Sequence, residues 1–595
     1  MNSLEELSNN TTSTGKYYTS EKHTQILIAL LKAHNIRKIV ASPGTTNICF
    51  VGSLQSDPYF EIYSSVDERS AAYIACGLAR ESGEPVVLSC TGATASRNYA
   101  PGLTEAYYSN LPVLAVTSTQ YQGRVGHLNP QVIDRSSQMN DLVRKSIQLR
   151  EAHTPEEEWD VNVSVNDALL ELRRHGGGPV HINLMTTYSK DFTVKELPEA
   201  RKINRYFSGN ELPSLLGKKI LIYVGTHVRW EDNLTKAVDD FCELYNAAVI
   251  CEHISNYRGK YGVYPALIGS QKNMTTPFLN VDVMLHIGSI LGATSVAHAA
   301  EIWRIHPDGE IRDTFKKLTN VFEMEEFSFF EYYVQKADSN TRKTDYYEKF
   351  HSACVSLEEK ISNLPFSNIW IARTSIPYLP ENSVLYLGIL NTLRSWNFFD
   401  IPHDKKIEIY SNTGGFGIDG LFSTLVGSSL ANPEKLHFGI IGDLAFFYDM
   451  NVAGNRHVGN NLRLMIINNG RGIEFRNYNH PAQRFGEAAD SYMAAAGHYG
   501  NMSRKLVKHY AEDLGYEYLC ASNKEEYLSA VEHFFTSNKK EKPVIFEVFT
   551  DYNDESNALQ SLHNLEIDVN GAAKKMAKSI LGEKGISVVK KLINK

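Results

Sequence analysis

The 595-residue sequence lacks the features that mark several protein classes. Its seven cysteines are an odd number without metal-type spacing, which argues against a disulfide framework or a zinc module and predicts a reducing compartment. No apolar run reaches the roughly 18 residues of a membrane span, and the polar N-terminal segment does not resemble a signal peptide. The net charge of −8 gives no indication of a nucleic-acid surface. We therefore expect a cytoplasmic enzyme or binding protein that uses neither a membrane nor nucleic acid.

The chain is too long for one hydrophobic core, and predicted strands and helices alternate along it. This alternation predicts an α/β fold with three doubly wound parallel-sheet domains. The expected parts are a flexible leader (1–18), a first domain (19–190), a linker (191–218), a central Rossmann-like domain (219–335), a helical linker (336–365), a third domain (366–550) and a helical tail (551–595) on the surface. No Gly-x-Gly-x-x-Gly motif occurs in the central segment, so dinucleotide binding there is weakly indicated.

Two predicted strands in the third domain are each followed by residues with side-chain oxygens that could bind a metal. One apolar run ends in Gly442 and Asp443, and the next ends in Asn468 and Asn469. In an open parallel sheet both turns lie at the C-terminal strand ends, where such folds bind ligands. Carboxylate, amide and carbonyl oxygens suit Mg²⁺, which also takes ligands from bound phosphate, and helix starts favour phosphate. The stretch predicts a Mg²⁺-diphosphate site, although two capped strand ends without a ligand would give the same pattern.

An acidic residue in the first domain is placed for proton transfer. Glu68 follows a predicted strand ending at Val66 and begins an Ala-rich helix. Apolar surroundings would keep its carboxyl partly protonated, as a relay for a weak carbon acid requires. The alternative is an ordinary helix N-terminal acid, favoured there by the helix dipole.

The two motifs together resemble one enzyme family. Twenty-four residues separate Asp443 from Asn468, a spacing similar to the Gly-Asp and Asn-Asn motif of thiamin diphosphate (ThDP) enzymes, although Leu444 replaces the usual glycine. Segments 66–80 and 90–113 resemble the pyrimidine-binding domain of the ThDP-dependent 2-oxoacid decarboxylases and carboligases. The resemblance covers about residues 20–550, and its two motifs fall in the first and third domains, as the family requires.

The resemblance implies ThDP and Mg²⁺ as cofactors, held between a pyrimidine (PYR) domain and a diphosphate (PP) domain. Glu68 would hydrogen-bond the pyrimidine ring and activate the cofactor, while Asp443, Asn469 and the carbonyl of Arg471 would hold the metal. Ile418, an apolar residue between glycine turns, would act as a wedge that keeps ThDP bent. The further cofactor contacts that the resemblance implies are Pro43, Asn98, Asn391, Thr392, Gly417, Gly442, Leu444, Ala445, Gly472 and Ile473.

Within the family, residues 412–420 resemble the signature of the menaquinone-pathway synthases, which join a decarboxylated 2-oxoglutarate to isochorismate. Arginines recognise carboxylates in those enzymes, but their positions hold Thr46, Thr413 and Trp396 here, and a middle-domain basic pair is missing around 291–294. These departures argue against the menaquinone reaction itself. The substrate candidates are Thr45, Thr46, His127, Gln131, Arg394 and Trp396, with Arg97, Arg394, Arg471 and Arg476 as sources of a different anionic site.

The expected function is decarboxylation of a 2-oxoacid with transfer of the acyl-anion equivalent to a carbonyl or alkene acceptor. Glu68 and Asp443 would come from different subunits, so a homodimer, alone or within a tetramer, would be the minimal active unit. A simple decarboxylase of the phosphonopyruvate or sulfopyruvate type and a non-catalytic ThDP-binding regulatory subunit are the alternatives. Binding of FAD by the middle domain, as in acetolactate-synthase relatives, stays open. His127 would transfer a proton or be a structural histidine.

Overall fold

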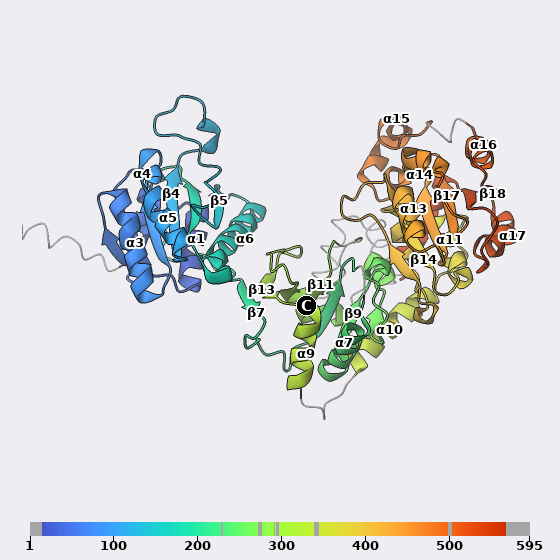
Figure 1. Ribbon diagram of the computed structural model, residues 1–595, viewed down its shortest axis with the longest axis horizontal. Coiled ribbons are helices and arrows are strands. Elements are labelled where there is room, and N and C mark those ends of the chain that lie inside the picture. The colour runs from blue at the N-terminus through green and yellow to red at the C-terminus, as the bar shows by residue number, and fades with distance from the viewer. Residues whose placement is uncertain are drawn as a thin grey trace, which may run out of the picture. The chain divides into compact units, whose positions relative to one another are not determined.

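The computed structural model describes residues 15–227, 230–271, 277–290, 292, 297–337, 344–497 and 503–566 (Figure 1). Most of the expected leader, the tail beyond residue 566 and three of the four positions around 291–294 lie outside these residues. The chain divides into two compact units, Met1–Phe207 with Gly309–Glu323, and Ser208–Asp308 with Met324–Lys595. In the ranges given above, no helix has both the length and the hydropathy to cross a membrane.

A parallel sheet with the strand order β2-β1-β3-β4-β6-β5 forms the centre of the first unit. Side chains of a strand point alternately to its two faces, and those of β4 divide accordingly between two apolar clusters. The strands are β1 Lys38–Ala41, β2 Glu61–Ser64, β3 Val86–Cys90, β4 Val113–Thr119, β5 Lys145–Leu149 and β6 Val180–Met185. The helices are α1 Lys22–Ala33, α2 Ile48–Gln55, α3 Glu68–Ser82, α4 Thr94–Asn98, α5 Ala100–Tyr108 and α6 Pro155–Glu171.

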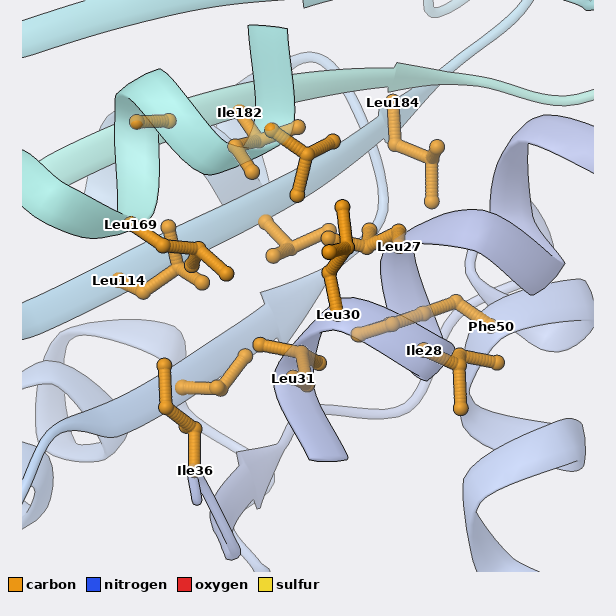
Figure 2. Packing of buried hydrophobic residues seen from close by; sticks show 14 of the residues in the cluster. Leu27, Ile28, Leu30, Leu31, Ile36, Phe50, Leu114, Leu169, Ile182 and Leu184 are labelled. Atoms are coloured by element: carbon orange, nitrogen blue, oxygen red, sulfur yellow. The ribbon is translucent and has the colours of Figure 1, made fainter. Parts of the chain in front are cut away.

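Figure 2 shows the cluster on one face of this sheet, where α1 and α6 cover the strands. Leu27 and Leu31 of α1 and Leu169 of α6 lie over Leu114 and Ile182 of the sheet. Each of these side chains is almost fully buried, which stabilises the fold by about 2 kcal/mol per residue. The apolar spacing of α1 in the sequence therefore corresponds to the core-facing side of that helix.

On the opposite face, α3 and α5 pack so closely that small residues are required between them. A side-chain carbon on Gly102 of α5 would lie 2.4 Å from the Cβ of Ala72 in α3. Asp67 caps α3 by accepting hydrogen bonds from the backbone N–H groups of Arg69 and Ser70, and Gly83 ends the helix with φ 67°. These contacts fix the position at which Glu68 begins α3.

A parallel pair of strands, β7 Asn204–Phe207 and β13 Leu318–Glu323, also belongs to the first unit. Arg174 connects segment 309–323 to the rest of this unit by ion pairs with Glu310 and Glu323 at 3.0 Å each. Segment 309–323 lies within the range expected for the central domain, yet it clusters with the first unit.

The second unit contains two further parallel sheets. One has the order β10-β9-β8-β11-β12, which matches the 3-2-1-4-5 order of Rossmann-like folds. The other, β15-β14-β16-β17-β19-β18, repeats the strand succession of the first unit. In Figure 1 the helices α11, α13 and α14 lie beside the strands of this sheet. The predicted fold class, three parallel sheets with flanking helices, is confirmed.

The bounds in the second unit are as follows. Its strands are β8 Ile220–Val224, β9 Ala248–Ile250, β10 Gly262–Val263, β11 Asn280–Ile287, β12 His298–Ile305, β14 Val384–Leu387, β15 Glu408–Tyr410, β16 His437–Gly442, β17 Leu462–Asn468, β18 Glu517–Ala521 and β19 Val544–Phe549. Its helices are α7 Asp232–Tyr245, α8 Ala266–Ser270, α9 Glu326–Lys336, α10 Asp345–Glu358, α11 Asn368–Ser375, α12 Asn391–Trp396, α13 Leu421–Ala431, α14 Asp443–Asp449, α15 Ala489–Tyr492, α16 Leu506–Asp513, α17 Lys524–Phe534 and α18 Tyr552–Leu562.

The described part of the expected tail is not a surface appendage. Helix α18 buries Glu555, Ala558 and Leu562 within the second unit. Beyond its end, the backbone N–H groups of Leu565 and Glu566 donate to the side-chain oxygen of Gln271, at 3.0 and 3.2 Å. The expectation of a surface helix rested on the many lysines of residues 551–595, but Glu555, Ala558 and Leu562 of its first helix are buried.

Candidate functional site

Three turns of the second unit meet at the C-terminal edge of its last sheet. Strand β16 pairs with β14 on one side and with β17 on the other, all in parallel. The chain runs outward from β14 to β15 and returns to the other side of β14 with β16, so the strand order reverses between β14 and β16. Open α/β sheets bind ligands in the crevice at such a point. The turns that follow these strands begin with Gly388, Asp443 and Asn469.

Asp443 is the first residue of α14 and is only 3% exposed. Burial raises the pKa of its carboxyl to about 7, with a further small contribution from Glu547, while the N–H groups of Leu444 and Gly470 oppose this rise. No ion pair links Asp443 to another residue in the described ranges. A buried carboxyl without a counter-charge is suited to a divalent cation, which would favour its ionised form.

The side-chain amides of the neighbouring Asn-Asn turn have different hydrogen-bond partners. Asn468 is 5% exposed and donates through Nδ2 to Glu547 Oε1 at 2.7 Å, so its side chain is engaged inside the sheet. Asn469 is half-buried, and its Oδ1 accepts a long hydrogen bond of 3.4 Å from the N–H of Arg471. Of the two side chains, that of Asn469 is therefore the one that lies in the turn after β17.

The predicted metal set contains one carboxylate, one amide and one backbone carbonyl. Arg471 directs its side chain away from the turn, since Nη1 lies 2.9 Å from Asp490 and its guanidinium stacks 4.3 Å from the Tyr552 ring centroid. Within the described ranges, no group of three or more His, Cys, Asp or Glu side chains could hold a metal. The oxygen donors of these turns fit a magnesium ion that completes its shell with phosphate and water.

The turn after β14 supplies further polar groups. Leu390 has φ 62°, and α12 begins directly after it with Asn391 and Thr392. The Nδ2 of Asn391 is buried and its amide lies beside Glu555. Thr392 is 4% exposed and its Oγ1 accepts a hydrogen bond of 3.2 Å from Nδ2 of Asn368. Both predicted residues thus stand at the same sheet edge as Asp443.

The remaining predicted cofactor residues of this unit lie in the adjoining turns. Gly417 is exposed and Ile418 half-buried in the loop between β15 and α13. Leu444 and Ala445 form the first turn of α14, and both are half-buried. Gly472 donates its N–H to Ala494 at 2.6 Å, and Ile473 is buried at the start of a short 3₁₀ segment.

In the first unit, the structure brings two predicted cofactor residues together. Glu68 is half-buried at the start of α3, and its Oε2 accepts a hydrogen bond of 3.3 Å from Nδ2 of Asn98. Pro43 and Thr45 are exposed in the turn after β1. The apolar enclosure expected for Glu68 is partial within its own unit, because Val66 beside it is 80% exposed.

The candidate substrate residues of the first unit differ in accessibility. His127 and Gln131 are exposed in the segment between β4 and β5, where Gln131 has φ 62°. Thr46 is only 4% exposed; its Oγ1 hydrogen-bonds Thr91 Oγ1 and donates to the carbonyl of Ser118 at 3.3 Å. Thr46 is therefore part of the network between the strand ends.

A buried cation in this unit was not found from the sequence. Arg135 is 3% exposed; its Nη2 donates to the same Ser118 carbonyl at 3.1 Å, while Nε and Nη1 have no hydrogen-bond partner in the part of the chain described. Burial, with a smaller contribution from the Arg97 guanidinium, lowers the pKa of Arg135 to about 10. In the sequence Arg135 simply follows Asp134, which is exposed. No local pattern indicates that Arg135 is buried.

The arginines considered for a different anionic site have protein partners. Arg394 forms an ion pair of 2.5 Å with Glu474, and Arg476 lies 3.6 Å from the Asp490 carboxylate that Arg471 also contacts. Arg97 is exposed and donates to the carbonyl of Asp134 at 3.0 Å. Trp396 has no exposed surface.

A cavity of about 500 Å³ lies beside α12 in the second unit. Asn391, Arg394 and Glu474 line it, together with Glu252 and His298 of the central domain. The cavity joins two predicted residues, Asn391 and Arg394, to polar groups of the central domain that the sequence did not single out. Apolar side chains, including Ile250, Ile268 and Phe398, line the rest of the cavity, so it combines apolar walls with a few charged groups.

Comparison with known proteins identifies several relatives of the chain. Residues 21–139 match the family "Thiamine pyrophosphate enzyme, N-terminal TPP binding domain". A Bacteroides thetaiotaomicron protein named 2-succinyl-5-enolpyruvyl-6-hydroxy-3-cyclohexene-1-carboxylate synthase is 33% identical over 92% of this chain and 99% of its own length. Proteins of that name from Bacteroides fragilis (31%, with 92% and 99% covered) and Flavobacterium johnsoniae (27%, with 88% and 95% covered) are also similar. The chain belongs to the family of ThDP-dependent enzymes that act on 2-oxoacids, as its two motifs predict.

Proposed function

We propose that the protein is a carboligase that decarboxylates a 2-oxoacid and transfers the resulting acyl-anion equivalent to a carbonyl or alkene acceptor. The observation that carries this proposal is the 33% identity to a named synthase over 99% of that protein's length. When bound, ThDP supplies the electron sink that decarboxylation of a 2-oxoacid requires. The chain would supply the metal ligands, the proton relay and the shape of the site.

Each cofactor residue has a role that its surroundings support. Asp443, Asn469 and the carbonyl of Arg471 would hold Mg²⁺, because they offer hard oxygens at the switch point of the sheet. Glu68 would hold a proton against the pyrimidine ring, and Asn98, 3.3 Å away, would orient its carboxyl. Ile418, half-buried between glycine turns, would support a bent cofactor.

The substrates would carry fewer carboxylates than those of the menaquinone reaction. Thr46 and Thr413 are buried, and the Thr413 hydroxyl lies 3.1 Å from that of Thr226, so neither offers a cation. Trp396 is buried as well. The three positions expected to hold carboxylate-binding arginines are therefore packed with uncharged side chains, which supports a smaller or less charged donor and acceptor pair.

We also propose a cytoplasmic homodimer, alone or within a tetramer, with active sites shared between subunits. Glu68 and Asp443 belong to different compact units of the chain. In the resembling enzymes the acid and the metal site come from two chains. Mass measurement in solution, followed by mixing of a Glu68→Gln chain with an Asp443→Asn chain, would test the shared site through recovery of activity in the heterodimer.

A substrate panel tests the reaction. The purified protein with ThDP and Mg²⁺ would be given 2-oxoacids, and CO₂ release and products would be measured with and without aldehyde and alkene acceptors. Carbon–carbon coupling products support the carboligase, whereas release of the simple aldehyde alone would establish a decarboxylase. Glu68→Gln should lower the rate at least 10²-fold, while Glu81→Gln, an exposed change on the same helix, should leave it unchanged. Binding of ThDP without any consumption of 2-oxoacid would favour the regulatory subunit.

A further inference from the structure

We propose that Glu555 of α18 is a positioning residue that holds together the two turns expected to bind the diphosphate and the metal. This inference rests on the proposed cofactor site. It assigns a function to the first turns of a segment that lies beyond both sequence motifs. Glu555 touches neither predicted metal ligand, so its effect would be transmitted through one neighbouring residue on each side.

On one side, Glu555 holds the turn after β14. The backbone N–H of Asn368, the first residue of α11, lies 3.0 and 3.1 Å from the two carboxylate oxygens of Glu555. The side chain of the same residue donates through Nδ2 to Thr392 Oγ1 at 3.2 Å. Asn368 therefore connects the carboxylate to α12, where Asn391 and Thr392 are predicted cofactor contacts.

On the other side, Glu555 holds the end of β17. Thr550 donates through Oγ1 to Glu555 Oε1 at 2.7 Å. Its backbone N–H donates to the carbonyl of Asn468 at 3.1 Å. Asn468 directly precedes the predicted metal ligand Asn469, so a single residue separates the carboxylate from the metal-binding turn.

Glu555 is a buried carboxyl, which is an unfavourable choice if the side chain only fills space in the core. The residue is 2% exposed, and burial raises the pKa of its carboxyl to about 7. The Asp554 carboxylate contributes to this rise, whereas Thr550, the N–H of Asn368 and the amide of Asn391 oppose it. Within the described residues, no cation pairs with Glu555. Buried carboxyls are retained where their hydrogen bonds position other groups, since an apolar side chain would otherwise fill the space at lower cost.

The same helix makes a second contact with the turn that begins with Asn469. Tyr552, one helical turn before Glu555, has its ring centroid 4.3 Å from the Arg471 guanidinium and 5.1 Å from that of Arg476. Arg471 is the residue whose carbonyl is the predicted metal ligand. Residues three apart lie on one face of a helix, so α18 presents Tyr552 and Glu555 together towards the cofactor turns.

The test is the affinity of the purified full-length protein for ThDP in the presence of Mg²⁺, measured by calorimetry, alongside its melting temperature. Glu555→Ala should weaken ThDP binding by about 10-fold or more, as the loss of outer-shell partners does at metal sites. Glu555→Gln should restore most of the affinity, because its amide oxygen can accept the Asn368 N–H and its NH₂ can donate to Thr550. Asn557→Ala, an exposed change on α18, is the control and should bind as the wild type.

Two further variants separate positioning from folding. Thr550→Val removes the hydroxyl bond to Glu555 but keeps the backbone bond to Asn468, and Asn368→Ala keeps the backbone bond to Glu555 but removes the link to Thr392. Each should weaken ThDP binding, and each should have little further effect in the Glu555→Ala background. Wild-type affinity in folded Glu555→Ala, or in both link variants if Glu555→Ala fails to fold, would overturn the inference. If the wild-type protein does not bind ThDP, that result would instead overturn the proposed function, and this inference with it.

Discussion

Gly442 and Ile467 lie opposite each other in the parallel pairing of β16 with β17. The register therefore places Asp443, the residue after β16, next to Asn468, the last residue of β17, at the C-terminal edge of the sheet. A separation of 24 residues in the sequence becomes one strand spacing, about 5 Å in such sheets. This relationship would allow an Asp and an Asn-Asn pair far apart in the chain to serve one ion.

The first prediction concerns the ionisation of Asp443. Asp443→Asn removes a carboxyl that is buried without a counter-charge, so the melting temperature of the cofactor-free protein should stay the same or rise. The same change should abolish the stabilisation that Mg²⁺ and ThDP give together, which is about 3 kcal/mol for the wild type at 100 times the dissociation constant. Thermal unfolding with and without both ligands measures the two effects.

Asp513→Asn, an exposed change at the end of α16, is the matched control and should respond to the ligands as the wild type does. A normal Mg²⁺-dependent rise in the melting temperature of Asp443→Asn would show that Asp443 does not hold the metal.

The sheets, and the positions of the turns that follow β16 and β17, could be predicted from the sequence because both depend on local patterns. Buried parallel strands are continuous apolar runs, and the residues that follow them identify the ligand edge. The contacts of Glu555 and Arg135 depend on tertiary packing instead. Glu555 looks like any acid near a helix start, and its role depends on Asn368, which lies 187 positions away in the sequence. Arg135 likewise contacts a strand-end carbonyl that no local motif predicts.

The second prediction concerns the packing that holds the Glu68 helix. Gly102→Ala would place a carbon 2.4 Å from the Cβ of Ala72, so α3 and α5 must move apart, and the first unit should lose about 1–3 kcal/mol of stability. Gly77→Ala, in the middle of α3, meets no atom within 4 Å and should instead gain up to about 1 kcal/mol from helix propensity. Urea unfolding of the two variants measures the difference. Equal stabilities would contradict the close packing of the two helices.

The third prediction concerns the buried cation of the first unit. Arg135→Met keeps a similar side-chain volume and removes a guanidinium that is 3% exposed with two unbonded nitrogens in the described structure. Because burying a charge without a partner costs several kcal/mol, the melting temperature should stay the same or rise. Arg150→Met, an exposed change nearby in the sequence, should shift stability by no more than about 0.5 kcal/mol. A loss of more than about 2 kcal/mol in Arg135→Met would show that the guanidinium has a stabilising partner.

The fourth prediction is a pH dependence of stability that originates from Glu555. The pKa of its carboxyl is raised from 4.5 to about 7 in the folded protein. Between these values the folded chain keeps a proton that the unfolded chain has released, so the contribution of Glu555 to the unfolding free energy falls as pH rises. Relative to Glu555→Gln, which does not titrate, the cofactor-free wild type should lose up to roughly 3 kcal/mol across this window.

Unfolding by urea at a series of pH values, without Mg²⁺ or ThDP, measures this difference. Groups that titrate in both proteins, including Asp443, cancel in the comparison because both chains contain them. Asn557→Ala should follow the wild-type curve at every pH, since its side chain is exposed on the opposite part of the helix surface from the buried carboxyl. Parallel curves for Glu555→Gln and the wild type would mean that the carboxyl ionises in the folded chain as it does in the unfolded one. The network through Asn368 and Thr550 would then have to stabilise the carboxylate as well as water does.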